Sequence, residues 1–222
     1  MHSLEIALLG ITIYNDWYNA YLSTFLISYF ISHILAYIYN NKFNLAKQIE
    51  YCKFADTRCI HGIPYFGDVV SNLGFILAGV YQYAIIKNFY FGIICIFIGI
   101  GSTYFHRSPS LNTLYWNRLP MIFGMTYIMN FYTHMEITSL LLHGLLALEY
   151  HAITKDLSLY VAYQINMILF LLWTNGLTMP LGYYMLAKIC EDNDINIYIR
   201  TKKIISGHTI KHILAALAMM SI

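Results

Sequence analysis

The sequence predicts an all-α integral membrane protein with about eight transmembrane helices. The composition is the first observation: 59% of the 222 residues are hydrophobic and only 11% are charged, against roughly 25% charged residues in soluble domains. The second is that the apolar residues fall into separate runs, several of which approach the roughly 17–25 residues that a helix needs to cross a bilayer. Too few polar side chains are present to cover a surface that faces water.

The expected spans follow one another with short connections. They cover approximately residues 20–39, 65–86, 89–105, 114–132, 137–151, 157–173, 180–191 and 205–222. The fifth and seventh are short, so we expect them to be tilted or partly interfacial. The first 18 residues contain no Lys or Arg, and a cleavable signal peptide needs a basic segment there, so we expect the first span to be retained. Residues 40–64 form the longest connection, which is long enough to fold over one end of the bundle.

We therefore expect a single transmembrane domain over residues 1–222. It consists of one extra N-terminal helix and loop, residues 1–50, and a helical bundle, residues 51–222. The formal net charge of +2 is too close to neutral for a nucleic-acid-binding protein, which needs a strongly basic face.

The basic residues predict an orientation. We name the membrane face that holds the N-terminus face A and the opposite face B. Eight crossings place ten Lys and Arg of the connections on face B, namely Lys42, Lys47, Lys53, Arg58, Arg107, Arg118, Lys155, Arg200, Lys202 and Lys203. Face A carries Lys87 alone. Cytoplasmic loops are enriched in Lys and Arg, so face B is predicted to be cytoplasmic.

Three histidines point to a metal site. Ser102 and His106 lie four residues apart near the end of the third span, and His208 and His212 are four apart at the start of the last; residues at this spacing share a helix face. Four expected crossings separate His106 from His208, so all three imidazoles lie at similar depth near face B. Three histidines with an open fourth position are typical of a catalytic zinc site, and Ser102 is placed to orient it. The other interpretation is that these are hydrogen-bonded packing residues, since HxxxH alone occurs by chance in many helices.

The motifs together resemble the CREST superfamily, and within it the alkaline ceramidase branch with its bacterial-type relatives. The segments that carry the resemblance are FADTRCIHGIPYFGDVVSNLGF, GSTYFHRSP, LYWNRLPM, YYMLAKICEDND and SGHTIKHILAALA, which together span about three quarters of the chain. The resemblance implies a bundle of seven helices, here preceded by one extra N-terminal helix. It also implies that His106, His208 and His212 bind Zn²⁺, and that Ser102 polarises the substrate carbonyl or stabilises its oxyanion.

The sequence departs from this pattern at one catalytic position. The family's acidic residue, which handles the proton of the water, falls at position 117, where this chain has Asn117. An amide can orient a water but cannot accept its proton at ordinary pH. Three interpretations are open: a natural variant with weak or lost activity, an inactivated variant, or a different carboxylate in the same role. Glu191, Asp192 and Asp194 are the candidates for that carboxylate, and Glu191, Asp194 and Arg118 are also candidates for supporting the metal ligands.

The resemblance also implies a calcium site near the first family helix. The candidate ligands are Glu50, Asp56 and Asp68, fewer than the six to eight oxygens that Ca²⁺ takes. We expect Asp56 to form a structural ion pair with Arg58 instead. Three further expectations concern polar helix contacts at Ser71 and Asn72, a Lys188–Glu191 pair, and a topologically allowed disulfide between Cys52 and Cys190.

The preferred function is a zinc-dependent intramembrane hydrolase that cleaves the amide bond of a ceramide-like lipid. One alternative is a lipid ester hydrolase with the same metal site, because ester leaving groups need less protonation. Another is a receptor-like or structural membrane protein whose zinc only stabilises the bundle, which Asn117 favours. A transporter is disfavoured because too few polar residues occur in the other spans.

Overall fold

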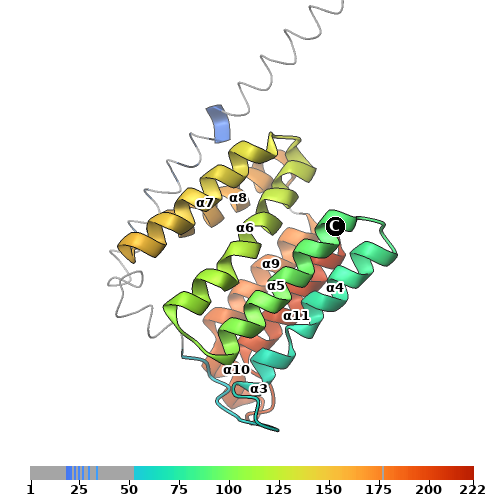
Figure 1. Cartoon of the computed structure of the whole chain (residues 1–222), viewed down its shortest axis with the longest axis vertical. Coiled ribbons are helices and arrows are strands. Elements are labelled where there is room, and N and C mark those ends of the chain that lie inside the picture. The colour runs from blue at the N-terminus through green and yellow to red at the C-terminus, as the bar shows by residue number, and fades with distance from the viewer. Residues whose placement is uncertain are drawn as a thin grey trace, which may run out of the picture. The chain divides into compact units, whose positions relative to one another are not determined.

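The structure is a computed structural model. It describes residues 53–222 except residue 177, together with residues 19–21, 23, 25, 27, 30 and 34. The helices of this part are α3 (Phe66–Val70), α4 (Leu73–Ala84), α5 (Phe89–Arg107), α6 (Leu111–Thr133), α7 (Ile137–Thr154), α8 (Ser158–Asn175), α9 (Met179–Asp192), α10 (Asp194–Arg200) and α11 (Gly207–Met220). Figure 1 shows these helices and no strand among the described residues. The all-α prediction is confirmed.

The expected helical segments from residue 65 onward all coincide with helices, with two differences. The expected segment 65–86 is two helices, because Ser71 Oγ and Asn72 Nδ2 both donate to the carbonyl oxygen of Asp68, at 3.1 and 2.9 Å. Side chains that bond to nearby backbone in this way compete with the helical ladder. The second difference is α10, a helix of seven residues within the expected connection 192–204. The first expected span lies largely outside the described residues.

The chain divides into two compact units. One contains α7 and α8, and the other contains α3, α4, α5, α9, α10, α11 and α6 as far as Tyr127. The expected division at residue 50 stays a prediction. All three histidines of the expected metal site fall in the second unit, which is described first.

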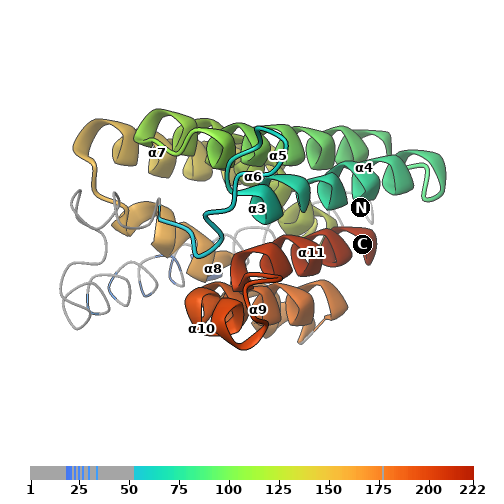
Figure 2. The same cartoon turned by 90° about the horizontal axis from the view of Figure 1, so that it is seen from below.

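Close helix packing builds this unit. In Figures 1 and 2, α4 lies beside α5 and α11, and α9 lies beside α11. Two glycines permit the approach of α4 to α5: a Cβ on Gly79 would lie 2.6 Å from the carbonyl oxygen of Gly92, and a Cβ on Gly92 would lie 2.8 Å from that of Gly79. Larger residues would force these helices apart. A core of Phe75, Ala78, Ile98 and Ala216 joins α4, α5 and α11.

The other unit has its own buried contacts. Leu140, Leu148 and Phe170 of α7 and α8 are fully buried. The ring of Tyr21 packs edge-on against Phe170, with ring centroids 5.7 Å apart. Glu136 caps α7 by accepting hydrogen bonds from the backbone N–H groups of the helix's first turn, and these bonds lower the pKa of Glu136 to about 2.

The outer faces of several helices are apolar. On α5 the exposed stripe consists of Ile93, Phe97, Ile100 and Tyr104, and on α7 it consists of Leu142, Leu146, Tyr150 and Ile153. Their spacing of three or four residues keeps each stripe on one helix face. Among the described helices, α5 and α7 are long and apolar enough to cross a membrane, by length and composition. A contiguous exposed apolar surface on a protein marks an interaction with a membrane or another protein.

Candidate metal centre

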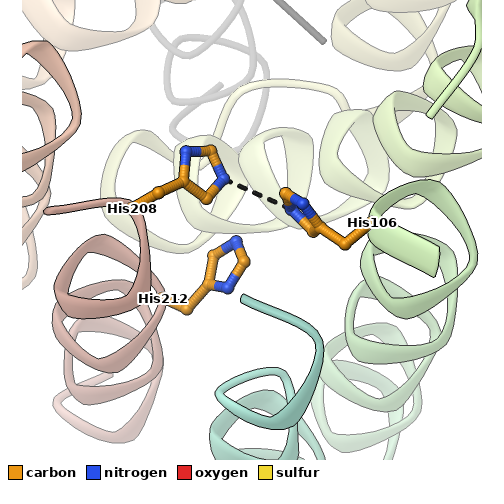
Figure 3. A group of neighbouring side chains, drawn as sticks. All are labelled: His106, His208 and His212. Carbon is orange, nitrogen blue, oxygen red and sulfur yellow. Dashed lines mark hydrogen bonds between the residues drawn. The ribbon is translucent and has the colours of Figure 1, made fainter. Parts of the chain in front are cut away.

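Three imidazoles from distant parts of the chain converge in the second unit. His106 lies in the last turn of α5, and His208 and His212 lie in the first two turns of α11. Figure 3 shows the three rings facing one another. The Nε2 atoms of His106 and His208 are 3.2 Å apart. One ligand atom from each of the three residues lies within 4.8 Å of the others, and the exposed fractions of the residues are 1%, 5% and 2%.

This geometry fits a small divalent cation. Zinc binds imidazole nitrogen at about 2.0–2.1 Å, which puts the nitrogens of a tetrahedral site about 3.3 Å apart. The His106–His208 separation matches this value, and the largest separation needs closure of about 1.5 Å. Without a metal, one ring of the His106–His208 pair can donate its Nε2–H to the Nε2 of the other, as the 3.2 Å contact in Figure 3 allows; a metal would instead receive the lone pairs of both. The donor set of three histidines suits Zn²⁺ better than the oxygen-seeking Ca²⁺ or Mg²⁺.

His212 has a hydrogen-bond partner on the side away from the other rings. Its Nδ1 lies 2.8 Å from Ser71 Oγ, in the break between α3 and α4. The polar contact expected at Ser71 is therefore present, and its partner on α11 is a histidine of the expected metal site. A metal-binding histidine ordinarily donates a hydrogen bond from the N–H of its second ring nitrogen to a nearby oxygen.

His208 is supported by two carboxylates. Asp194 Oδ1 accepts from the backbone N–H of His208 at 2.8 Å, and Asp194 Oδ2 accepts from the backbone N–H of Ala55 at 2.9 Å. Glu191 Oε1 lies 3.9 Å from His208 Nδ1 and 2.5 Å from Lys211 Nζ. The expected ion pair of Glu191 with Lys188 is also present.

These contacts bear on the search for a catalytic carboxylate. Glu191 lies on the Nδ1 side of His208, whereas Nε2 faces His106. Both oxygens of Asp194 accept backbone N–H groups. Asp194 is therefore occupied in holding the backbone of His208, and Glu191 lies on the side of the His208 ring away from His106.

Phe54 covers the imidazoles. Its ring centroid lies 4.5 Å from that of His106 and 4.9 Å from that of His208, and it also packs edge-on against Phe105. Phe54 is 6% exposed. It shields the rings from water on this side, and nothing in the sequence had singled it out.

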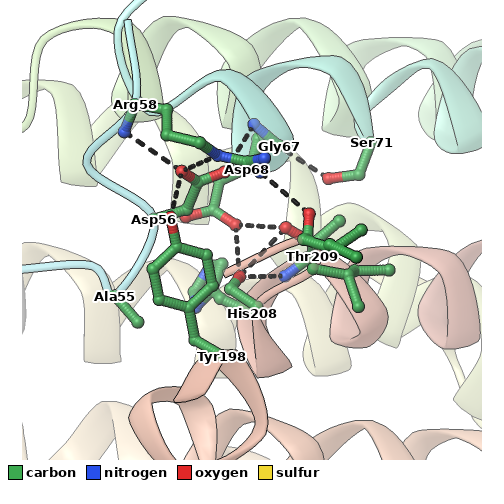
Figure 4. Close-up of polar contacts among 12 residues, drawn as sticks. Ala55, Asp56, Arg58, Gly67, Asp68, Ser71, Tyr198, His208 and Thr209 are labelled. Carbon is green, nitrogen blue, oxygen red and sulfur yellow. Dashed lines mark hydrogen bonds and ion pairs between the residues drawn. The ribbon is translucent and has the colours of Figure 1, made fainter. Parts of the chain in front are cut away.

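A polar staple holds the segment that carries Phe54. Asp56 is fully buried and forms the expected ion pair with Arg58, whose Nη2 lies 2.6 Å from Asp56 Oδ2. Asp56 also accepts from the backbone N–H of Gly67 at 3.0 Å and from Tyr198 Oη at 3.2 Å (Figure 4). Burial alone would raise the pKa of Asp56, but hydrogen bonds from Arg58 and Gly67 outweigh it and leave the pKa below the usual value of 3.8.

The expected calcium site stays a prediction, because Glu50, one of its three candidate ligands, is not among the described residues. Asp56 is bound to Arg58, and Asp68 Oδ1 accepts hydrogen bonds from Ser206 Oγ at 2.9 Å and Thr209 Oγ1 at 2.7 Å. Both aspartates are therefore used in holding loop and helix together. The disulfide expected as topologically allowed also falls outside, because Cys52 is not among the described residues.

The expected catalytic residues lie near the same end of α5. Ser102 is 4% exposed and stands one turn before His106. At Gly101 the backbone of α6 comes close: a Cβ there would lie 2.7 Å from the carbonyl oxygen of Trp116 and 3.4 Å from Asn117 Cα. Asn117 thus lies beside the turn of α5 that carries Ser102, and it is half-buried. The next residue, Arg118, is 5% exposed.

Gly207 sets the position of α11. A Cβ on this residue would overlap the carbonyl oxygen of Cys190 and would lie 2.7 Å from Asp194 Cα. The first turn of α11 therefore rests directly on the backbone at the junction of α9 and α10. This contact brings His208 within reach of Asp194 and Glu191.

No family model matches the chain, and no curated protein or solved structure matches it either. The resemblance to alkaline ceramidases stays a prediction that the motifs alone carry.

Proposed function

We propose that this protein is a zinc-dependent membrane hydrolase that cleaves the amide bond of ceramide-like lipids. The observation that carries the proposal is the convergence of three buried imidazoles, with Nε2 of His106 and His208 3.2 Å apart. A zinc ion held by three neutral imidazoles polarises a carbonyl group and activates water near neutral pH. The motif resemblance supplies the lipid amide as substrate class.

The chain's own residues have separate tasks in this proposal. Ser102 offers a hydroxyl to the substrate carbonyl one helical turn from His106. Phe54 excludes water from one side of the imidazoles, which strengthens polar interactions there. Asp194 holds the backbone N–H of His208, and the Glu191 carboxylate lies 3.9 Å from its Nδ1. Asn117 orients a water or the substrate amide, but it does not take up a proton.

The proposal extends to the membrane. The apolar stripes on α5 and α7 and the buried polar residues of the second unit support a protein that turns its apolar side to lipid. In the proposed arrangement about eight helices cross the bilayer, and the metal centre lies near the cytoplasmic face. A lipid substrate would then reach the centre laterally between helices.

Asn117 favours a second candidate function. Without a general base at this position, the same zinc would serve only to stabilise the bundle of a receptor-like or structural protein. This candidate predicts that zinc raises the melting temperature while no lipid is hydrolysed. A lipid ester as substrate is the intermediate case, because its leaving group needs less protonation.

Metal analysis of the purified protein beside His208→Ala tests the centre itself. We expect one zinc per chain in the wild type and its loss in the variant. His134→Asn is the matched control: His134 is exposed and has a φ of 56°, which Asn tolerates. Retention of zinc by His208→Ala, or its equal loss from His134→Asn, contradicts the assignment.

Release of fatty acid from ceramide and from a phospholipid then separates the candidate functions. Faster release from ceramide supports the amidase, and faster release from the phospholipid supports the esterase. Zinc-dependent thermal stabilisation with no release from either supports the structural role.

A further inference from the structure

The contact between Ser71 and His212 has a defined direction. Ser71 Oγ lies 3.1 Å from the carbonyl oxygen of Asp68, which can only accept a hydrogen bond. Both contacts of Ser71 are hydrogen bonds only when its hydroxyl proton goes to Asp68, since a hydroxyl has a single proton to donate. Ser71 Oγ also lies 2.8 Å from His212 Nδ1, so in this second bond the hydroxyl oxygen accepts and the imidazole N–H donates. Figure 4 shows Ser71 and Asp68.

This direction selects one tautomer of His212. A neutral imidazole carries its single proton on one nitrogen, and the other nitrogen holds the lone pair. With the proton on Nδ1, the lone pair lies on Nε2. The alternative tautomer would set the Nδ1 lone pair against the oxygen lone pairs of Ser71, in a ring that is only 2% exposed.

We propose that Ser71 is a positioning residue for the metal centre, which fixes the tautomer and ring orientation of His212 so that Nε2 binds the metal. The inference rests on the metal site of the proposed function and gives a role toward the metal centre to Ser71, which the sequence had predicted only as a polar helix contact. Ser71 acts through His212 and does not touch the metal.

Asp68 makes this contact rigid. Its carbonyl oxygen holds the Ser71 hydroxyl, and its carboxylate accepts hydrogen bonds from Ser206 and Thr209 in the first turn of α11. One fully buried residue therefore ties the Ser71 break to the helix that carries His212. The distance from Ser71 to His212 does not depend on a long flexible side chain at either end.

The other two ligands lack an equivalent anchor at Nδ1. In the part of the chain that the structure describes, His106 Nδ1 has no hydrogen-bond partner. His208 Nδ1 lies 3.9 Å from Glu191, beyond hydrogen-bond range. Loss of the Ser71 hydroxyl would therefore remove the side-chain hydrogen bond that holds the second nitrogen of His212.

The test is metal affinity, with Co²⁺ as a spectroscopic probe in place of Zn²⁺. Ser71→Val and Ser71→Thr have the same branched shape and differ in the hydroxyl, so any steric effect is common to both. We expect Ser71→Val to bind Zn²⁺ and Co²⁺ about 10–100-fold more weakly, as typical for loss of a partner of a ligating histidine. We expect Ser71→Thr to stay within about threefold of the wild type. The Co²⁺ absorption band of Ser71→Val should shift and weaken, because the His212 ring is no longer held.

Ser221→Ala is the control for loss of a serine hydroxyl as such. Ser221 Oγ donates to the carbonyl oxygen of Ala218, three residues earlier, as Ser71 does to Asp68, and no hydrogen bond joins it to a histidine among the described residues. It should leave metal affinity and the Co²⁺ spectrum unchanged. Circular dichroism and melting of the metal-free proteins confirm that the variants fold.

The outcomes separate the two proposals. If the wild type binds one metal and the Val and Thr variants both match its metal affinity and its spectrum, the role of Ser71 is overturned and the centre stays intact. No metal binding by the wild type overturns the centre, and the role of Ser71 with it. Equal losses in the Val and Thr variants assign the effect to side-chain shape, which also overturns the hydrogen-bonding role.

Discussion

Gly207→Ala tests whether α11 rests on the junction of α9 and α10. An added Cβ would overlap the carbonyl oxygen of Cys190 and lie 2.7 Å from Asp194 Cα. Both are backbone atoms and cannot rotate away. The carbonyl oxygen of Cys190 would lie 2.1 Å from the added Cβ, so restoring ordinary contact of 3.4 Å requires a shift of about 1.3 Å there and about 0.7 Å from Asp194 Cα. Even the smaller shift stretches the 2.8 Å bond from His208 N–H to Asp194 to about the limit of a hydrogen bond.

The magnitude follows from two effects. Overpacking of this kind destabilises by about 1–3 kcal/mol, and loss of a hydrogen bond to a charged acceptor by about 1.5–3 kcal/mol. Allowing for partial relaxation, we expect about 3 kcal/mol, or a fall in melting temperature of about 6–12 °C for a chain of this size. Because His208 moves with the helix, metal affinity should fall as well.

The assay is thermal unfolding of the detergent-solubilised protein, with and without a chelator. Gly182→Ala is the matched control, because Gly182 lies within α9 and a Cβ there meets nothing within 4 Å. This control should be neutral or stabilising by up to about 1 kcal/mol. A Gly207→Ala protein with the wild-type melting temperature and metal affinity would refute the close contact.

Two further predictions concern chemistry and pH. Asn117→Asp should raise amide hydrolysis by roughly 10²–10⁴-fold if position 117 holds the general base; equal rates at unchanged zinc content would remove this position from the mechanism. The second concerns Asp56, whose pKa is lowered in the folded protein, so its contribution to stability is present above the unfolded value of 3.8 and is lost as pH falls through the lower folded pKa. Asp56→Asn should therefore melt at a lower temperature than the wild type at neutral pH, with the difference shrinking below about pH 4; a difference that grows on acidification would contradict the pairing with Arg58.

The ligand set was accessible from sequence because it depends on spacing and on the number of helices. His208 and His212 share a face by their spacing of four, and an even number of expected crossings returns the chain to the end of α5 that holds His106. Both inferences survive errors of a few residues in the helix boundaries.

The supporting contacts were not accessible, because they join residues with no local pattern. Ser71 is 141 positions from His212 and occurs in a stretch that reads as continuous helix. The break that exposes it depends on two side chains that bond to one carbonyl of Asp68. Phe54 is one aromatic residue among many, and its contact with His106 appears only when the preceding connection folds over the bundle.

Asp194 joins Ala55, which lies 139 positions before it, to His208, which lies 14 positions after it, since one carboxylate oxygen accepts from each backbone N–H. If either segment opens, the carboxylate loses one of its two backbone donors and the remaining segment loses part of its anchor. The segment around Ala55 that carries Phe54 over the imidazoles and the first turn of α11 should therefore open and close together. Access to the buried rings then depends on the combined stability of these two segments, not on the motion of a single loop.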